Sequence, residues 1–181
     1  APADKKLYAL RDVTGTIESV PLISASIMSK KIAEGIDALV LDVKCGKGAF
    51  MKTREDARTL ARSLVAIGKS AGVRTEAVLT AMNWPIGFAV GNANEVIECI
   101  DLLKGRGRAD LVANSLELSY RMLITARVAR DRSDAEAMCR RALESGQALE
   151  RLRAIIERQG GDPRVIHDYS LMPHAPEQHI I

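Results

Sequence analysis

Near the start of the chain, three polar residues have the chemistry to bind or activate a ligand: Arg11, Ser26 and Lys30. Ser26 and Lys30 are four residues apart, so on a helix their side chains lie one turn apart on the same face. Arg11 precedes them in RDVTGT, whose Asp, Thr and Gly residues favour a turn that can return the guanidinium to that face. The spacing therefore predicts a polar ligand site, with a solvated Arg and Lys beside a surface Ser as the alternative.

The element that must position the serine and the lysine is a helix, which we predict over residues 19–34. Ser19 suits the N-cap, Pro21 suits the first turn, and Gly35 suits the stop. Apolar side chains recur between these signals at helical spacing, so one face of this helix is expected to pack against a core.

Downstream, short apolar runs alternate with amphipathic helices. Runs rich in β-branched residues within 38–43 and 73–82 predict buried strands, and residues 53–71 predict the helix between them. Further helices are predicted over 93–104, 109–128, 133–146 and 146–159, followed by an irregular tail over 160–181. This order predicts an α/β fold in which part of a parallel or mixed sheet is covered by helices and preceded by a helix of a small all-α domain. Because two strands do not complete a sheet and the chain starts without Met, we expect an excised piece.

Composition argues against several classes of function. The 26 basic and 23 acidic side chains are spread along the chain and only 3% of residues are aromatic, so we expect no nucleic-acid partner. No apolar run approaches the about 20 residues of a membrane-spanning helix, so no membrane association is expected. Cys45, Cys99 and Cys139 form no CxxC pair and predict reduced thiols in a cytoplasmic protein.

Longer stretches carry a family resemblance. The run LYALRDVTGTIESVPLISASIMSKKIAEGIDALVLDVKCGKGAFMK resembles the central segment of the pyrimidine-nucleoside and thymidine phosphorylases. The similarity continues through VLTAMNWPIGFAVGNANEVIE to about HDYSLMP, and it includes the unusual strings DVKCGKGAFM and GFAVGNA. It covers nearly the whole chain.

In that family, phosphate cleaves the N-glycosidic bond of uridine, thymidine or deoxyuridine and gives the free base and a pentose 1-phosphate. The resemblance implies that inorganic phosphate is the co-substrate of this pentosyl transfer and that no organic cofactor takes part. It also implies that Tyr8, Arg11, Ser26 and Lys30 surround the pyrimidine, the last three as catalytic residues. The departing base gains negative charge on its carbonyl oxygens, which cationic donors stabilise.

The resemblance further implies a structural cation, expected to be monovalent potassium, near the loop after the second strand. Some family members hold such an ion with two backbone carbonyls and one carboxylate, and the matching positions are Ile86, Ala89 and Glu98. Oxygen ligands suit hard cations. The alternative is that Glu98 is an exposed helical residue. Trp84 and Asn94 depart from the residues expected around this loop.

The resemblance also implies a nucleoside phosphorylase or phosphoribosyltransferase-like fold with two domains. Residues 1–34 would be part of the small helical base-binding domain, and residues 35–181 part of the α/β phosphate-binding domain. The family's phosphate-binding segment lies before the region matched here, so we expect the isolated chain to be inactive and the full-length enzyme to be a homodimer. The alternative is a non-catalytic fragment or interaction module that kept the scaffold. The glycine-rich DVKCGKGAF is expected to form a structural turn, because it is not a phosphate-loop pattern.

Overall fold

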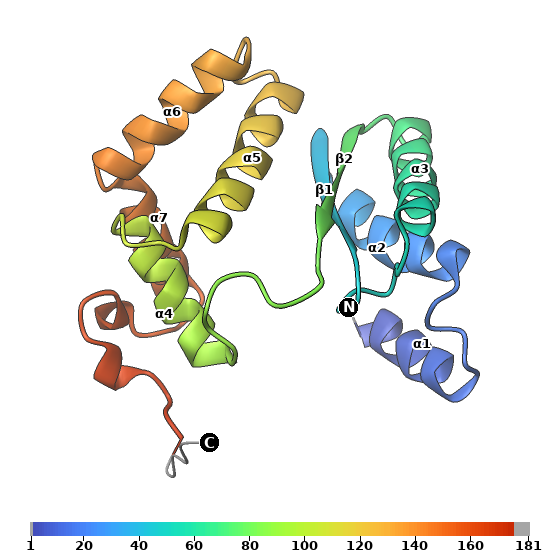
Figure 1. The fold of residues 1–181 in the computed structure, drawn as a ribbon, viewed down its shortest axis with the longest axis horizontal. Helices are drawn as coiled ribbons and strands as arrows, with labels where there is room; N and C mark the ends of the chain where they lie inside the picture. The colour runs from blue at the N-terminus through green and yellow to red at the C-terminus, as the bar shows by residue number, and fades with distance from the viewer. Residues whose placement is uncertain (1, 176–181) are drawn as a thin grey trace. The chain divides into compact units, whose positions relative to one another are not determined.

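The structure, a computed structural model, describes residues 2–175, and contacts between residues divide it into two compact units. One unit comprises the chain up to Trp84 together with Glu117–Ala135, and the other comprises Pro85–Leu116 together with the chain from Glu136 onward. In chain order the elements are α1 (Pro2–Val13), α2 (Val20–Ala33), β1 (Ala38–Cys45), α3 (Arg54–Ser70), β2 (Arg74–Ala81), α4 (Asn92–Leu103), α5 (Ala109–Thr125), α6 (Arg132–Glu144), α7 (Gln147–Arg158), η1 (Pro163–Ile166) and η2 (Tyr169–Leu171) (Figure 1). Residues 176–181 of the predicted irregular tail lie outside the described residues.

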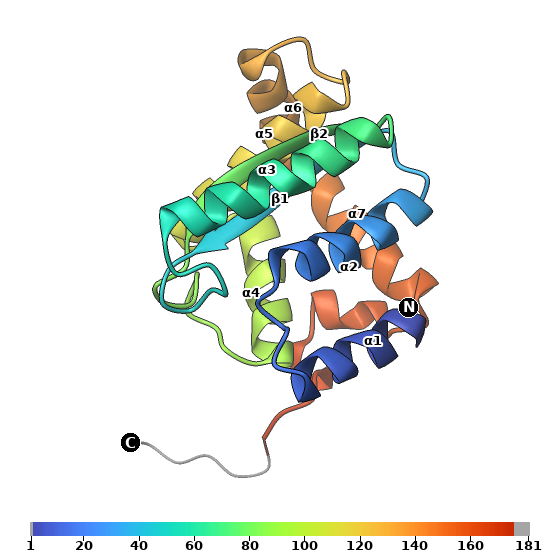
Figure 2. The ribbon, with the colours of Figure 1, turned by 90° about the vertical axis from the view of Figure 1, so that its right-hand side faces the viewer.

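The first unit is built on a βαβ motif, as the sequence predicts. β1 and β2 pair in parallel, from Ala38 opposite Arg74 through Cys45 opposite Ala81, and α3 connects them. α3 begins after the N-cap Thr53, whose hydroxyl accepts a backbone hydrogen bond. α3 and α2 lie on the same side of this two-stranded sheet (Figure 2). The predicted α/β class is therefore confirmed, with the sheet limited to these two strands in the described part of the chain.

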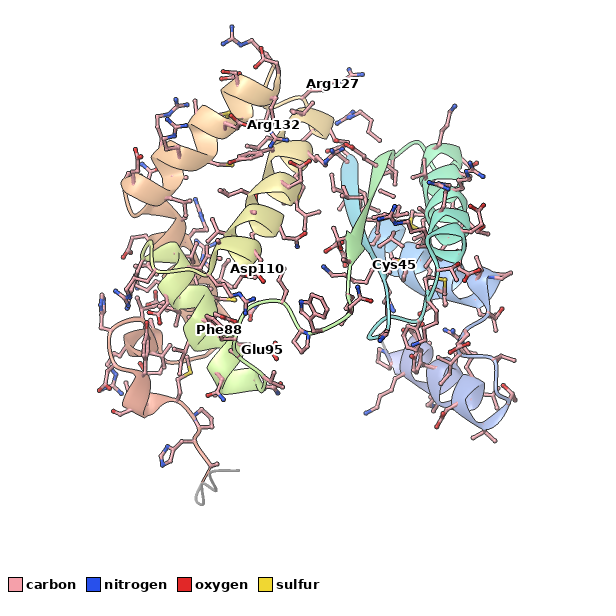
Figure 3. All side chains as sticks on the ribbon, viewed as in Figure 1. Cys45, Phe88, Glu95, Asp110, Arg127 and Arg132 are labelled. Atoms are coloured by element: carbon pink, nitrogen blue, oxygen red, sulfur yellow. The ribbon has the colours of Figure 1, made fainter. Side chains whose placement is uncertain are left out.

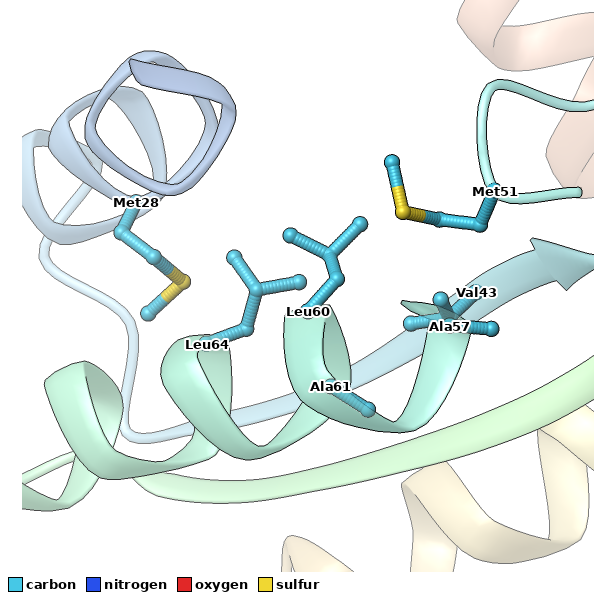
Figure 4. Packing of buried hydrophobic residues seen from close by; sticks show 7 residues of the cluster. All are labelled: Met28, Val43, Met51, Ala57, Leu60, Ala61 and Leu64. Atoms are coloured by element: carbon cyan, nitrogen blue, oxygen red, sulfur yellow. The ribbon is translucent and has the colours of Figure 1, made fainter. Parts of the chain in front are cut away.

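The core of this unit lies between α2, α3 and β1. Its buried members are Met28, Val43, Met51, Ala57, Leu60, Ala61 and Leu64 (Figure 4). The four from α3 stand at positions i, i+3, i+4 and i+7, which places them on one helix face. Met28 of α2 is 1% exposed and belongs to the same cluster, so α2 and α3 share one core. How residues 1–34 and 35–181 divide between the domains of a whole protein stays a prediction.

Close packing between α3 and β2 requires a glycine at position 68. A Cβ added to Gly68 would lie 2.0 Å from Thr75 Oγ1 and 2.8 Å from Thr75 Cβ. We therefore expect Gly68→Ala to lower the free energy of unfolding by about 1–3 kcal/mol because it overpacks this contact. In a helix without such a contact, the same substitution raises stability by up to about 1 kcal/mol.

Urea unfolding followed by circular dichroism measures the sign of this change. Ser70→Ala, at the exposed end of the same helix, is the matched control and is expected to leave the unfolding midpoint nearly unchanged. A more stable Gly68→Ala variant would show that the helix does not press on Thr75.

One helix lies where the sequence predicts none. The RDVTGT stretch predicts irregular backbone at Arg11. In the structure, α1 extends to Val13 and Arg11 lies in its last turn. Asp4 in the first turn and Arg11 in the last complement the helix dipole. The turn follows the helix, where the Thr14 amide donates to the Leu10 carbonyl at 3.0 Å. The buried residue of α1 is an arginine, so the helix lacks the buried apolar stripe on which the sequence-based assignment depended.

The second half of α5, from Glu117 onward, belongs to the first unit and contacts β2 through charged side chains. Arg121 pairs with Glu76 of β2 and, at 2.6 Å, with Glu117 one turn earlier in α5. Arg132 also pairs with Glu117 at 2.6 Å. The two arginines hold the pKa of the Glu117 carboxyl below its usual range, with the Arg132 hydrogen bond as the larger cause. These ion pairs hold the part of α5 from Glu117 onward beside β2.

In the second unit, the end of α4 holds the tail. Lys104 donates hydrogen bonds to the Ile166 carbonyl and, at 3.2 Å, to the Tyr169 hydroxyl. Tyr169 in turn donates to Asp101 at 2.6 Å. The tail that the sequence predicts to be irregular thus contains η1 and η2 and is anchored by side chains.

The predicted helices after residue 92 correspond to α4, α5, α6 and α7, with ends that differ by at most a few residues. Among residues 2–175, no helix is both long enough and apolar enough to span a membrane.

Candidate functional site

Ser26 and Lys30 are joined on one face of α2, as their spacing predicts, and a carboxylate from α1 connects them. Ser26 Oγ donates to Asp4 Oδ1 at 2.8 Å, and Lys30 Nζ lies 2.6 Å from Asp4 Oδ2. Lys30 Nζ also donates to Ser26 Oγ at 3.2 Å. Sequence reasoning missed Asp4, which is 22 and 26 residues away from its partners, and no local pattern signals that contact.

The surroundings of Asp4 favour its charged form. Its hydrogen bond from Lys30, and then the one from Ser26, lower the pKa of this carboxyl below its ordinary value. A lowered pKa in the folded state means that the interaction is present above the unfolded-state value of about 3.9 and is lost as the pH falls through the folded-state value. The three side chains therefore stay connected at neutral pH.

Arg11 fixes the turn between α1 and α2. It is 8% exposed, and its guanidinium donates to the backbone carbonyls of Thr16, at 3.4 Å, and Ile17. The same guanidinium lies 5.0 Å from the ring centroid of Tyr8, a cation–π contact. The two carbonyl bonds use two of the five N–H donors of the side chain. Three further N–H donors remain on this side chain beyond these two bonds.

These residues surround one cavity of about 470 Å³ between α1 and α2. Asp4, Tyr8, Arg11 and Ser26 line it together with apolar side chains of both helices, including Leu7, Leu10 and Leu22. Lys30 does not line the cavity but reaches its wall through Asp4. A mostly apolar cavity of this size with a few convergent polar groups is typical of a small-molecule site. The structure thus brings the four predicted residues together, and their roles toward a ligand stay predictions.

A second cavity of about 500 Å³ lies against α2, α3 and β1 and is the weaker candidate. Its charged residues include Lys44 and Asp42, which pair with each other at 2.6 Å, and Asp42 also accepts the Thr80 hydroxyl at 2.5 Å. Lys44 and Asp42 are thus paired with each other, whereas Arg11, which lines the cavity between α1 and α2, has N–H donors beyond its two bonds to carbonyls.

The glycine-rich loop after β1 forms a structural turn. The amide of Gly46 donates to the Met51 carbonyl at 3.0 Å, and the amide of Gly48 donates to the Met82 carbonyl at 2.8 Å. A Cβ at either glycine would lie within 3.0 Å of Met82 backbone atoms, so the close approach requires glycine. Both amides are bonded to protein carbonyls and do not form an anion cradle, as the sequence indicates.

The predicted cation ligands lie around a loop that Glu98 of α4 holds. Its carboxylate accepts the amide hydrogens of Phe88 at 2.7 Å and Ala89 at 3.3 Å. Phe88 lies in this loop and Glu95 in the adjoining helix (Figure 3). Glu98 is thus a loop anchor rather than a solvated helical residue.

The fit of a cation to this loop is only partial. A cation needs the carbonyl oxygens of the loop, whereas the Glu98 carboxylate here binds amide hydrogens, which leaves each of its oxygens one further lone pair. Within residues 2–175, no cluster of three His, Cys, Asp or Glu side chains could hold a metal ion. The cation site on Ile86, Ala89 and Glu98 stays a prediction.

The cysteines are free thiols, and two of them are poor candidates for nucleophilic catalysis. Cys45, Cys99 and Cys139 form no disulfide. Burial raises the pKa of the Cys139 thiol, and burial followed by the nearby Glu98 and Glu95 charges raises that of Cys99. Both thiols therefore stay protonated, and a protonated thiol is a poor nucleophile.

Comparison with known proteins defines the class to which this fold and site belong. The model of the glycosyl transferase family, a/b domain, matches residues 1–149, and the chain belongs to this family. The chain is 52% identical over 177 residues to the pyrimidine-nucleoside phosphorylase of Bacillus subtilis (strain 168). It is 53% identical over 177 residues to the pyrimidine-nucleoside phosphorylase of Staphylococcus aureus (strain USA300).

These alignments cover 98% of this chain and 41% of each relative, so the chain spans about two fifths of the length of the curated relatives it matches. The predicted family is confirmed, and the two-stranded parallel sheet with its helices is consistent with part of the phosphorylase fold.

Proposed function

We propose that this chain is the pyrimidine-binding part of a pyrimidine-nucleoside phosphorylase, which cleaves uridine, thymidine and deoxyuridine with inorganic phosphate. The observation that carries this proposal is that Tyr8, Arg11 and Ser26 line the same cavity, between α1 and α2. Lys30 is hydrogen-bonded to Asp4, which also lines it. The names of the relatives, which are pyrimidine-nucleoside phosphorylases, support it.

The proposed reaction transfers a pentosyl group from nitrogen to oxygen. The bond between the base nitrogen and C1′ of the sugar breaks, and a phosphate oxygen forms a new bond to C1′. The electron pair of the broken bond stays with the base and spreads onto its carbonyl oxygens. Arg11 and Lys30 place N–H donors where that charge develops, so they stabilise the transition state more than the neutral nucleoside.

Ser26 is proposed to act as an acceptor toward the base. Its hydroxyl proton is directed to Asp4 and Lys30 donates to one lone pair of Oγ, so the oxygen has one further lone pair with which to accept from a ligand. Uracil and thymine carry a ring N–H between their two carbonyls and can donate to such an acceptor. The geometry therefore supports nucleosides of these two bases as the substrates of the site.

Phosphate, the cation and the second subunit are proposed for the whole protein. The resemblance places the phosphate-binding segment outside the matched region, so we propose that the isolated chain does not turn over nucleosides. We also propose that the whole protein is a homodimer and that it holds potassium at Ile86, Ala89 and Glu98.

A segment-exchange enzyme tests the proposed function. In it, the matching segment of the Bacillus subtilis relative is replaced by the corresponding residues of this chain. We expect this enzyme to phosphorolyse uridine, measured as release of uracil, whereas the isolated chain with uridine and phosphate releases none.

Two results would contradict this expectation. Turnover by the isolated chain would show that a phosphate site is built from residues within it. A segment-exchange enzyme that is folded by circular dichroism but neither binds nor cleaves uridine would remove the proposed role. Uridine binding without cleavage would instead support the alternative of a binding module that kept the scaffold.

A further inference from the structure

Asp4 connects α1 to both polar residues of α2 in the candidate site. Its side chain comes from the first turn of α1 and contacts two residues of α2 at once, with one carboxylate oxygen on Ser26 and the other on Lys30. Asp4 also lines the cavity that those residues border. It is therefore the group through which α1 sets the direction of both polar side chains of α2.

Lys30 gains most from this contact. A lysine side chain has a flexible four-carbon stem, and ordering it for ligand binding costs conformational entropy. The Lys30 side chain is 40% exposed, so packing alone does not fix it, whereas the Asp4 side chain is 25% exposed. Two of the three N–H donors of Lys30 bond to Asp4 and Ser26, which holds the ammonium in place and leaves one donor for a ligand.

Ser26 is directed in the same way. A hydroxyl has one proton, and here that proton faces Asp4 at 2.8 Å while Lys30 donates to the same oxygen. Without the carboxylate, the proton can rotate toward the cavity and the oxygen loses its preference for an N–H donor. One carboxylate thus fixes the polarity of the serine and the location of the lysine.

We propose that Asp4 is a positioning residue that orders Lys30 and Ser26 for a pyrimidine base. This inference rests on the proposed function, since it assumes that the cavity between α1 and α2 receives the base. Asp4 acts through its two partners and does not itself have to touch the ligand. Pre-ordering of this kind increases affinity by removing the ordering cost from the binding step.

A double-mutant cycle on the full 181-residue chain tests this role, with uridine as the probe and ¹H–¹⁵N NMR titration as the measurement. We expect Asp4→Asn to raise the dissociation constant for uridine about fivefold to tenfold, and Lys30→Met to raise it by at least as much. Because Asp4 acts through Lys30 and Ser26, Asp4→Asn in a Ser26→Ala/Lys30→Met background is expected to add less than about twofold. Glu34→Gln is the control. It removes an exposed carboxylate that pairs with Lys31 at the end of α2, and it is expected to leave the dissociation constant for uridine unchanged.

A second readout needs no ligand. The hydrogen bonds from Lys30 to Asp4 and Ser26 are expected to slow exchange of its ammonium protons with solvent. Their NMR signal is therefore expected in the parent chain and in Glu34→Gln but not in Asp4→Asn. This readout decides the question if Lys30→Met binds uridine too weakly to measure. The amide signals of α1 report whether Asp4→Asn leaves that helix folded.

The outcomes separate this proposal from the function on which it rests. If the parent chain binds no uridine at this cavity, the base-binding function and the positioning role both fail. If the parent binds but Asp4→Asn binds equally well or more tightly, or if Asp4→Asn keeps its full effect in the Ser26→Ala/Lys30→Met background, the positioning role fails and the proposed function stands. Retention of the Lys30 ammonium signal in Asp4→Asn would also overturn the positioning role.

Discussion

Arg11→Ala in the segment-exchange enzyme is expected to lower kcat/KM for uridine phosphorolysis by about 10²–10³, the usual consequence of removing one donor aimed at developing charge. The guanidinium is buried against the turn, and Arg11 lines the cavity together with Tyr8 and Ser26. Its loss removes a cation from the place where the base becomes negative. Initial-rate measurements of uracil release give the ratio directly.

The same substitution also removes the hydrogen bonds to the carbonyls of Thr16 and Ile17, so a control must separate catalysis from the structure of the turn. Lys30→Met leaves that turn intact and removes the other cation, and it is expected to reduce kcat/KM to a similar extent. If Arg11→Ala alone lowers activity and Lys30→Met stays within about threefold of the parent, the turn rather than the cationic donors accounts for the loss.

Leu64→Ala is expected to lower the free energy of unfolding of the chain by about 2–5 kcal/mol, the usual range for a large-to-small change in a core. Leu64 is 1% exposed and packs in the cluster that joins α2, α3 and β1. The substitution removes packing contacts within this cluster, which also contains Met28. Urea unfolding monitored by circular dichroism measures the loss.

Leu10→Ala is the matched control because the same atoms are removed from a leucine that is 58% exposed. Its unfolding midpoint is expected to stay close to that of the parent chain. Equal losses for the two variants would mean that the cluster around Leu64 is not the core that stabilises α2 on the sheet.

The strands and the helix of the βαβ motif could be predicted because each carries a strong local signal. β1 has a continuous apolar run, and Thr53 caps the start of α3. α1 could not be predicted in the same way, because its buried residue is Arg11 and its apolar side chains Leu7 and Leu10 stay exposed. A helix that faces a core buries such leucines, whereas α1 leaves both of them exposed.

The candidate site was predictable only in part. Ser26 and Lys30 share a helix face that their spacing fixes, whereas Asp4 meets them through the packing of α1 on α2, which no short pattern encodes. The roles of Tyr8 and Arg11 came from the family resemblance, and the structure adds that Arg11 also locks the turn between the two helices.

The loop near Glu98 shows a different limit of sequence reasoning. Residue types identify carboxylate and carbonyl oxygens that suit a cation, but they do not determine whether amide hydrogens already occupy the carboxylate. In the structure, Glu98 accepts the amides of Phe88 and Ala89, and Arg108 donates to the Gly87 carbonyl at 3.0 Å. The loop is thus organised by protein donors.

NMR mapping of uridine on the chain tests base binding at the cavity between α1 and α2, and it does not require the remaining segments of a whole phosphorylase. The account predicts that added uridine shifts the signals of Tyr8, Arg11 and Ser26, which border the cavity between the first two helices, and leaves Phe50 and Leu41, beside the other cavity, unmoved. Saturating shifts at Phe50 and Leu41, or no saturable shifts at any position, would contradict it.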